Sequence, residues 1–315
     1  MSNVINLENV NSEALNRAGK IGRVGITERA HHLKREAIWK TPNGDEFPEG
    51  VKACMERARF YTQAYQASEG EPDQIRRAKA FANALDNMTI FIKDKELIVG
   101  YCTSKPEYLP LWPELSNNCN REALKEPYLT DEEKEEYRKY VEYWMPRTLQ
   151  SRTERLLTDE EKDVVSTGVI LGNGTYQSGY TSPSPGMANV LDNGLEKIIA
   201  DVKAKLDAAE ERIHGSVAFG PEEVELVKKT EEWKAMLIAD EAVIRWTARY
   251  SKLATVMAEH EADPVRKAEL EEIARIALKV PAKPAEHFQE AVQCIWFLTI
   301  CYHQVERLSS GCPYR

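Results

Sequence analysis

The sequence predicts a mainly α-helical fold with a few short strands. Apolar residues recur at the three- and four-residue spacing of a helix over most of the chain, and helix-start signals precede many of these runs. Runs typical of strands are short by comparison. The best of them are Met88–Ile92 and Leu97–Tyr101, on either side of a charged corner, and we expect two short strands or buried extended segments there.

The N-terminal part divides into an arm and a helical region. Residues 1–20 are polar and rich in Asn, so we expect a loose N-terminal arm. Residues 21–315 are expected to form one helical region, which opens with a short basic helix over 23–39. Turn-forming residues fill positions 41–50.

Two helices are predicted between residues 56 and 87. Arg57, Phe60, Tyr61 and Ala64 recur with helical spacing and give the first of them one aromatic and apolar face. Gly70 and Pro72 end that helix, because glycine adopts a left-handed conformation readily and proline cannot continue a helix. A second stripe then runs from Ile75 to Leu85.

The middle of the chain combines loops with strong helix starts. Residues 101–130 are rich in Pro, Asn and aromatics and are predicted to form a long ordered loop. Thr130 and Thr158 each precede Asp-Glu-Glu, which is an N-cap followed by first-turn acids. Residues 164–187 form a Gly/Ser/Thr/Pro-rich stretch that resembles a binding loop, but its glycines lack the spacing of a phosphate-binding loop. The helices expected after it cover Leu191–Leu206, Trp233–His260, Arg266–Leu278 and the segment from Pro284 onward.

Composition excludes several classes of function. The net charge of −9 argues against nucleic-acid binding, which requires a basic surface. The most apolar run, Cys294–Tyr302, is too short to span a membrane, and the N-terminus lacks a secretory signal, so a cytoplasmic location is expected. The six cysteines show no metal-binding spacing, so no metal is expected, and Cys294 and Cys301 are predicted to pack in the core.

Three ordered sequence blocks identify a family resemblance. They are Glu-Arg-Ala at 56–58, the run Gly-x-Pro-x-x-Ile-Arg-Arg-Ala-Lys-Ala at 70–80, and Ile-x-Asp-x-Glu-Leu-Ile-Val-Gly at 92–100. Their order and spacing closely resemble the N-terminal region of glycyl radical enzymes, the pyruvate formate-lyase-like family. The last segment also fits, since Pro284, Phe288, Glu290, Gln293 and Trp296 match a family helix. The resemblance implies the N-terminal helical part of a ten-stranded α/β barrel.

The resemblance implies radical chemistry whose central residues are absent here. Family members are lyases, decarboxylases and dehydratases in which a cysteine thiyl radical abstracts hydrogen from a small organic substrate. Neither the Gly-Cys loop of the barrel nor the C-terminal glycine block occurs, and Cys312 is not assigned the thiyl role because Pro313 follows it. No catalytic residue is therefore assigned, and whether the chain is an enzyme is left open. We expect a fragment, truncated before the barrel is complete and inactive alone.

Two other functions remain open. One is a non-catalytic helical scaffold or interaction protein derived from the family. The other is a small-molecule enzyme with its own site at Glu114, Tyr180 and Glu306, which requires those residues to converge.

The resemblance also suggests substrate-binding residues. Gly179-Tyr180-Thr181 stands where the family commonly has Gly-His-Ser/Thr in a loop that lines the substrate pocket, and Glu306 matches a family glutamate. Tyr180, Thr181 and Glu306 are therefore expected to bind substrate. Tyrosine in place of histidine departs from the glycerol-type dehydratases and favours an aromatic-acid decarboxylase or related lyase.

The expected cofactors and partners follow from the same family. No cofactor is expected to stay bound, because a separate S-adenosylmethionine and iron–sulfur activating enzyme installs the glycyl radical. The partners are a small-molecule substrate, this activase and, at full length, a second copy of the chain in a homodimer. The sequence does not specify the substrate, the bond that is cleaved or the oligomeric state.

Overall fold

A computed structural model of the chain describes residues 28–29, 32–33, 52–105, 108–125, 129–167, 186–216, 218 and 220–306. It divides into two compact units, residues 1–48 with 93–96 and residues 49–92 with 97–315. In the first unit the described residues of the 28–33 stretch are helical, and His32 Nε2 lies 3.8 Å from the Asp94 carboxylate. The predicted arm over residues 1–20 and most of the predicted helix over 23–39 lie outside the described residues.

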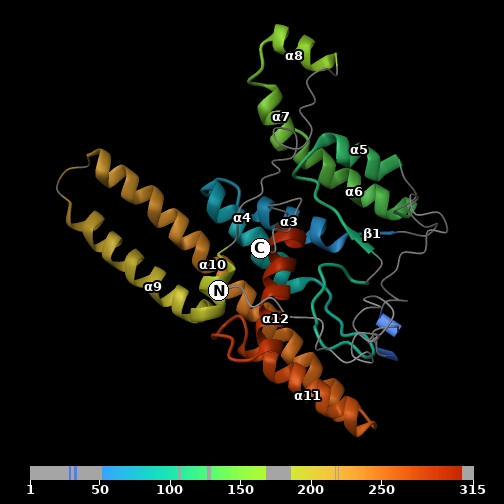
Figure 1. Cartoon of the computed structure of the whole chain (residues 1–315). Coiled ribbons are helices and arrows are strands. Elements are labelled where there is room, and N and C mark those ends of the chain that lie inside the picture. Colours follow the sequence, from blue (N-terminus) through green and yellow to red (C-terminus); the bar gives the residue numbers. More distant parts are fainter. Residues whose placement is uncertain are drawn as a thin grey trace, which may run out of the picture. The chain divides into compact units, whose positions relative to one another are not determined.

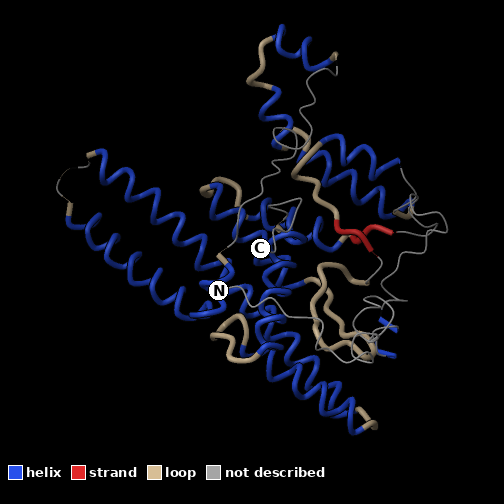
Figure 2. Tube along the Cα trace, viewed as in Figure 1, coloured by secondary structure: helices blue, strands red, loops and turns tan. Residues whose placement is uncertain are grey.

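The second unit is built mainly of helices, as Figures 1 and 2 show. This confirms the predicted fold class. The elements are β1 (Lys52–Cys54), α3 (Glu56–Ala67), α4 (Asp73–Asn87), β2 (Tyr108–Pro110), α5 (Asn117–Lys125), α6 (Asp131–Trp144), α7 (Leu149–Glu154), α8 (Asp159–Ser166), α9 (Met187–Gly215), α10 (Pro221–His260), α11 (Pro264–Lys279), α12 (Phe288–Thr299) and the π-helix η2 (Ile300–Val305).

The predicted helix boundaries agree where local signals are strong. Thr130 and Thr158 both form capping boxes, in which the threonine hydroxyl accepts from the third helical N–H and the glutamate there accepts from the threonine N–H. Gly70 adopts φ +91° after α3, and Pro72 is the N-cap of α4. These ends are set by a few neighbouring residues and can therefore be recognised from the sequence.

The two strands do not lie where the sequence suggested. β1 and β2 pair in parallel, with Lys52 opposite Tyr108 and Cys54 opposite Pro110. Residues 88–92 and 97–101 form no strand, so the strand alternative was wrong there, but Met88 and Val99 are buried as the other alternative requires.

Side chains take the place of a neighbouring strand along residues 99–101. The Gln293 amide accepts from the Val99 N–H at 2.9 Å and donates to the Val99 carbonyl at 2.7 Å. The Tyr250 hydroxyl accepts from the Tyr101 N–H at 2.9 Å. The buried backbone is thus hydrogen-bonded without a sheet.

The stretch 101–130 is more regular than the predicted loop. It contains β2 and the helix α5. The Asn120 amide on α5 donates to the Pro113 carbonyl at 2.9 Å and accepts from the Tyr137 hydroxyl at 2.7 Å. These contacts with α6 and the preceding loop hold a helix of only nine residues, in a stretch whose Pro and Asn content favoured a loop.

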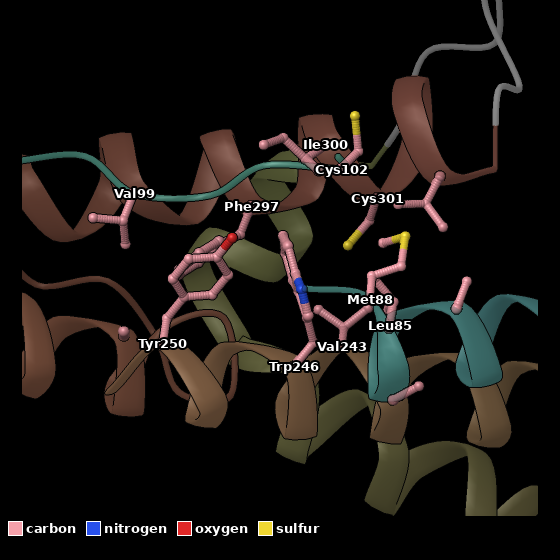
Figure 3. Close-up of a cluster of buried hydrophobic side chains, with 14 of the residues drawn as sticks. Leu85, Met88, Val99, Cys102, Val243, Trp246, Tyr250, Phe297, Ile300 and Cys301 are labelled. Atoms are coloured by element: carbon pink, nitrogen blue, oxygen red, sulfur yellow. The ribbon is translucent and has the colours of Figure 1, made fainter. Parts of the chain in front are cut away.

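The main core forms where α10 meets α4 and α12 (Figure 3). The rings of Trp246 and Tyr250 extend from α10 toward Phe297 on α12, with centroids 5.3 Å and 5.7 Å from the Phe297 ring. All three rings are completely buried. Cys294 and Cys301 are also buried, which agrees with their predicted packing role.

A kink in α9 fixes how its two halves meet the loop before α12. Gly194 breaks the helix with φ +74°, and the N–H groups of Leu195 and Glu196 donate to the carbonyls of Pro281 and Ala282 at 2.8 Å and 2.9 Å. The loop carbonyls thereby cap the second half of α9.

Across the residues that the structure describes, no helix has the length and apolar character needed to cross a membrane.

Candidate functional site

Glu306 lies directly after η2 and faces α3 and α4. Its side chain is 12% exposed. Tyr61 on α3 donates its hydroxyl to Glu306 Oε2 at 3.1 Å, and Arg77 on α4 donates Nε–H to Glu306 Oε1. Both carboxylate oxygens are therefore engaged by donors from two different helices.

Arg57 joins the backbone just before Glu306 to the loop after β2. The guanidinium is fully buried, and its Nε donates to the Val305 carbonyl at 2.5 Å. Its terminal nitrogens bind the Glu114 carboxylate at 2.6 Å and 3.2 Å, and one of them also donates to the Leu111 carbonyl at 3.2 Å. Arg57 thus satisfies acceptors from two segments that are far apart in the sequence.

The network contains two arginines and two carboxylates, of which only Arg77 is substantially exposed. Burial raises the pKa of Glu306, while the charges of Arg77 and Arg57 act in the opposite direction. Burial, together with the Glu306 charge, raises the pKa of Tyr61 well above its usual value, so its hydroxyl stays protonated as a donor. The guanidinium of Arg57 also lies 4.2 Å from the Tyr61 ring centroid, a cation–π distance.

A cavity of about 450 Å³ opens beside Glu306. Its wall is mainly apolar and comes from α4, α9, α10, α12 and η2, while polar side chains enter it from α4 and from Glu306. A cavity of this size with few polar groups is typical of a small-molecule site. The lining residues are Gln74, Arg77, Ala78, Phe81, Gly186, Met187, Val190, Ala235, Met236, Ala239, Leu298, Cys301, Tyr302 and Glu306.

The predicted site residues have different outcomes. Glu306 lies at this cavity, whereas Tyr180 and Thr181 lie outside the described residues. Arg57 binds the Glu114 carboxylate and the Val305 carbonyl, so it connects the Glu114 side chain to the backbone next to Glu306. Within the described part of the chain, no group of three or more His, Cys, Asp or Glu side chains could hold a metal ion.

Sequence reasoning assigned no role to Arg57, Tyr61 or Arg77. The sequence places Arg57 and Tyr61 on one face of a helix and Arg77 in a family block. Their partners Glu306 and Val305 lie more than 200 positions away, so no local spacing could have revealed the pairing. The one available signal was that Arg57 and Arg77 lie inside the family blocks.

Comparison with known proteins identifies the family. Residues 26–315 match the Pyruvate formate lyase-like family. The chain belongs to this family of glycyl radical enzymes. The family resemblance inferred from the three sequence blocks is therefore confirmed.

The curated relatives include lyases and dehydratases. The chain is 29% identical over 265 residues to the isethionate sulfite-lyase of Nitratidesulfovibrio vulgaris, which covers 78% of this chain and 31% of the relative. It is 30% identical over 258 residues to the (2S)-3-sulfopropanediol dehydratase of Klebsiella oxytoca, which covers 78% and 30%. The chain thus spans about a third of the length of the relatives it matches.

Solved structures agree with this assignment. The glycerol-bound B12-independent glycerol dehydratase of Clostridium butyricum aligns with TM-score 0.76 and 31% identity, over 89% of this chain and 34% of that one. A glycyl radical enzyme of Archaeoglobus fulgidus aligns with TM-score 0.71 and 31% identity, over 81% and 33%. The fold of this chain therefore corresponds to about a third of the length of each of these solved structures.

Proposed function

We propose that this chain forms the N-terminal helical part of a glycyl radical lyase, decarboxylase or dehydratase. The complete enzyme would act on a small organic substrate by thiyl-radical hydrogen abstraction. This chain alone would not turn over, because the cysteine and glycine blocks that the chemistry needs are absent from its 315 residues. Its role would be to build and brace one wall of the substrate pocket.

The observation that carries this proposal is the position of Glu306. A carboxylate held by Tyr61 and Arg77 at the edge of an apolar cavity has a fixed orientation before any substrate arrives. Fixed polar groups of this kind orient a substrate at low cost, since they need no rearrangement on binding. We assign Glu306 to substrate binding on this ground.

We include Tyr180 and Thr181 in this proposal because only a few residues separate them from the cavity along the chain. Thr181 lies five residues before Gly186, which lines the cavity. Five residues span at most about 18 Å when extended. Thr181 and Tyr180 are thus five and six residues along the chain from a residue of the cavity, and a tyrosine there favours a substrate with an aromatic or otherwise apolar body.

The partners follow from the family. The family uses a glycyl radical that an activase installs. We propose that a radical S-adenosylmethionine activase serves the complete protein, that no cofactor remains bound to this chain, and that the complete protein is a homodimer.

Electron paramagnetic resonance tests the proposal. The natural full-length protein, incubated anaerobically with an activase, S-adenosylmethionine and a reductant, should show a glycyl radical doublet, and this chain under the same conditions should show none. A radical or substrate turnover in this chain alone would contradict the proposal. A silent, monodisperse and cooperatively folded natural protein would favour the scaffold alternative.

A further inference from the structure

The cavity beside Glu306 has one polar end. Gln74 and Arg77 lie three residues apart on α4 and therefore on one helix face. Both side chains line the cavity, and both residues are exposed. Most of the remaining wall is apolar, with Phe81, Met187 and Met236 among its larger side chains. The cavity therefore combines an apolar interior with a polar mouth.

The mouth offers hydrogen-bond donors to which none of the described residues is bonded. Arg77 donates to Glu306 through Nε, and among the described residues its two terminal nitrogens have no recorded partner. These two nitrogens carry four N–H groups in a planar fork. The side chain is 48% exposed, so the unused donors are accessible from solvent.

The carboxylate at the mouth is less available than the guanidinium. Glu306 is 12% exposed and already accepts from Tyr61 and Arg77, one donor for each oxygen. Each oxygen keeps a further lone pair, but burial leaves a ligand amine little room to approach it. A ligand anion only has to reach the outer edge of Arg77, whose Nε bond to Glu306 fixes the plane of the guanidinium.

We propose that this cavity binds an organic anion with an apolar body, whose carboxylate or similar group pairs with the terminal nitrogens of Arg77. The apolar body lies among Phe81, Met187, Met236 and their neighbours, where its burial is favourable. Arg77 favours ligands that carry a negative charge, and the apolar wall favours ligands with an apolar body. The inference rests on the proposed function only in assuming that the ligand binds in the cavity beside Glu306.

Binding can be measured on this chain as it exists, without activase or radical. Three probes with one phenylpropyl body separate the alternatives: 3-phenylpropionate, 3-phenylpropan-1-ol and 3-phenylpropylamine. Calorimetric titration should show binding of the acid, with affinity at least about tenfold above that of the alcohol, because the charge-assisted bond is lost in the alcohol. The amine should bind no better than the alcohol.

Two substitutions locate the site. Arg77→Gln should weaken the acid at least about tenfold and leave the alcohol nearly unchanged, whereas Arg138→Gln, an exposed arginine of α6 paired with Glu135, should change neither. Ala239→Phe fills the cavity from α10 and should abolish binding of both acid and alcohol. It also tests the site if Arg77→Gln proves unfolded by circular dichroism.

Three results would overturn the inference. They are equal affinity for the three probes, tightest binding of the amine, and no binding of the acid at all. Acid binding that survives Ala239→Phe would place the site elsewhere and overturn it too. Absence of a glycyl radical signal in the full-length protein would contradict the proposed function but would not affect this binding result.

Discussion

Tyr61 and Glu306 are 245 positions apart in the sequence, yet the tyrosine hydroxyl donates to the glutamate carboxylate at 3.1 Å. This bond, with those from Arg77 and Arg57, fixes the end of η2 against α3 and α4. The C-terminal end of the described chain is thus held by polar contacts with its first two long helices.

Replacing Tyr61 by Phe should destabilise the protein by about 1–3 kcal/mol, because a buried carboxylate oxygen loses its donor. Urea unfolding followed by circular dichroism measures this. Tyr143→Phe removes a hydroxyl that donates to exposed Glu69 and accepts from Arg76, which keeps the Tyr65 carbonyl and Glu69 as acceptors, so it should change the free energy of unfolding by less than about 1 kcal/mol. Equal effects of the two substitutions would show that the bond to Glu306 contributes no more to the free energy of unfolding than the exposed bond to Glu69.

Glu290 should make stability fall in acid. Burial alone would raise its pKa, but Lys279, the Glu286 N–H and Arg275 outweigh burial and hold the pKa at about 2, below the ordinary 4.5. A carboxylate whose pKa is lower in the folded than in the unfolded protein stabilises the fold fully above the unfolded pKa. This stabilisation is lost as the pH falls toward the folded pKa. The contribution of Glu290 should therefore disappear between about pH 4.5 and pH 2.

Glu290→Gln tests this directly. At pH 6 it should cost about 1–3 kcal/mol, because a buried charged acceptor is lost, and the cost should shrink as pH falls below 4.5. Glu272→Gln, which also loses a bond to Arg275 but lies at a half-exposed position, should cost less at pH 6. A cost for Glu290→Gln that is the same at pH 6 and pH 3 would be inconsistent with the lowered pKa.

Gly194→Ala should be one of the most damaging small substitutions. A Cβ there would lie 2.5 Å from the Ala282 carbonyl oxygen and 2.6 Å from the Lys283 Cα, both backbone atoms, and φ is +74°. Strain and overpacking together predict a loss of about 3 kcal/mol. Gly215→Ala, at the end of the same helix with open space around it, should be neutral or slightly stabilising. Thermal unfolding of both variants tests this prediction. Equal melting temperatures would contradict the close approach of Gly194 to the backbone of Ala282 and Lys283.

The buried thiols should be unreactive in the native protein. Burial raises the pKa of Cys102 and of Cys294 to about 12, and raises that of Cys301 further. Thiolate, the reactive form, is therefore almost absent at pH 8. In a Cys119→Ser, Cys312→Ser background, Ellman's reagent should label these cysteines only after urea is added. Rapid labelling without urea would contradict the burial.

Local signals in the sequence predicted much of the helical framework. The Thr130 and Thr158 caps and the apolar faces of α3 and α4 depend on residues within one or two turns, so their periodicity and spacing can be recognised directly. Resemblance over three short blocks was enough to predict the family.

Features that depend on distant partners could not be predicted in the same way. Val99 lies in an extended segment whose hydrogen-bonding partner is the Gln293 side chain, 194 positions later. The short parallel pairing of β1 with β2 and the helix α5 also depend on tertiary contacts. The Arg57, Tyr61 and Arg77 contacts around Glu306 belong to the same class, because a carboxylate near the end of the described chain finds its donors near the beginning.

The central claim is that this chain is the N-terminal part of a glycyl radical enzyme. Reading the encoding DNA past the Arg315 codon, together with the mass of the native protein, tests it most directly. We expect the reading frame to continue into a barrel with a Gly-Cys loop and a C-terminal Arg-Val-x-Gly block followed by an aromatic residue. A stop codon after Arg315 and a native mass of 35.8 kDa would contradict the claim and favour the non-catalytic scaffold.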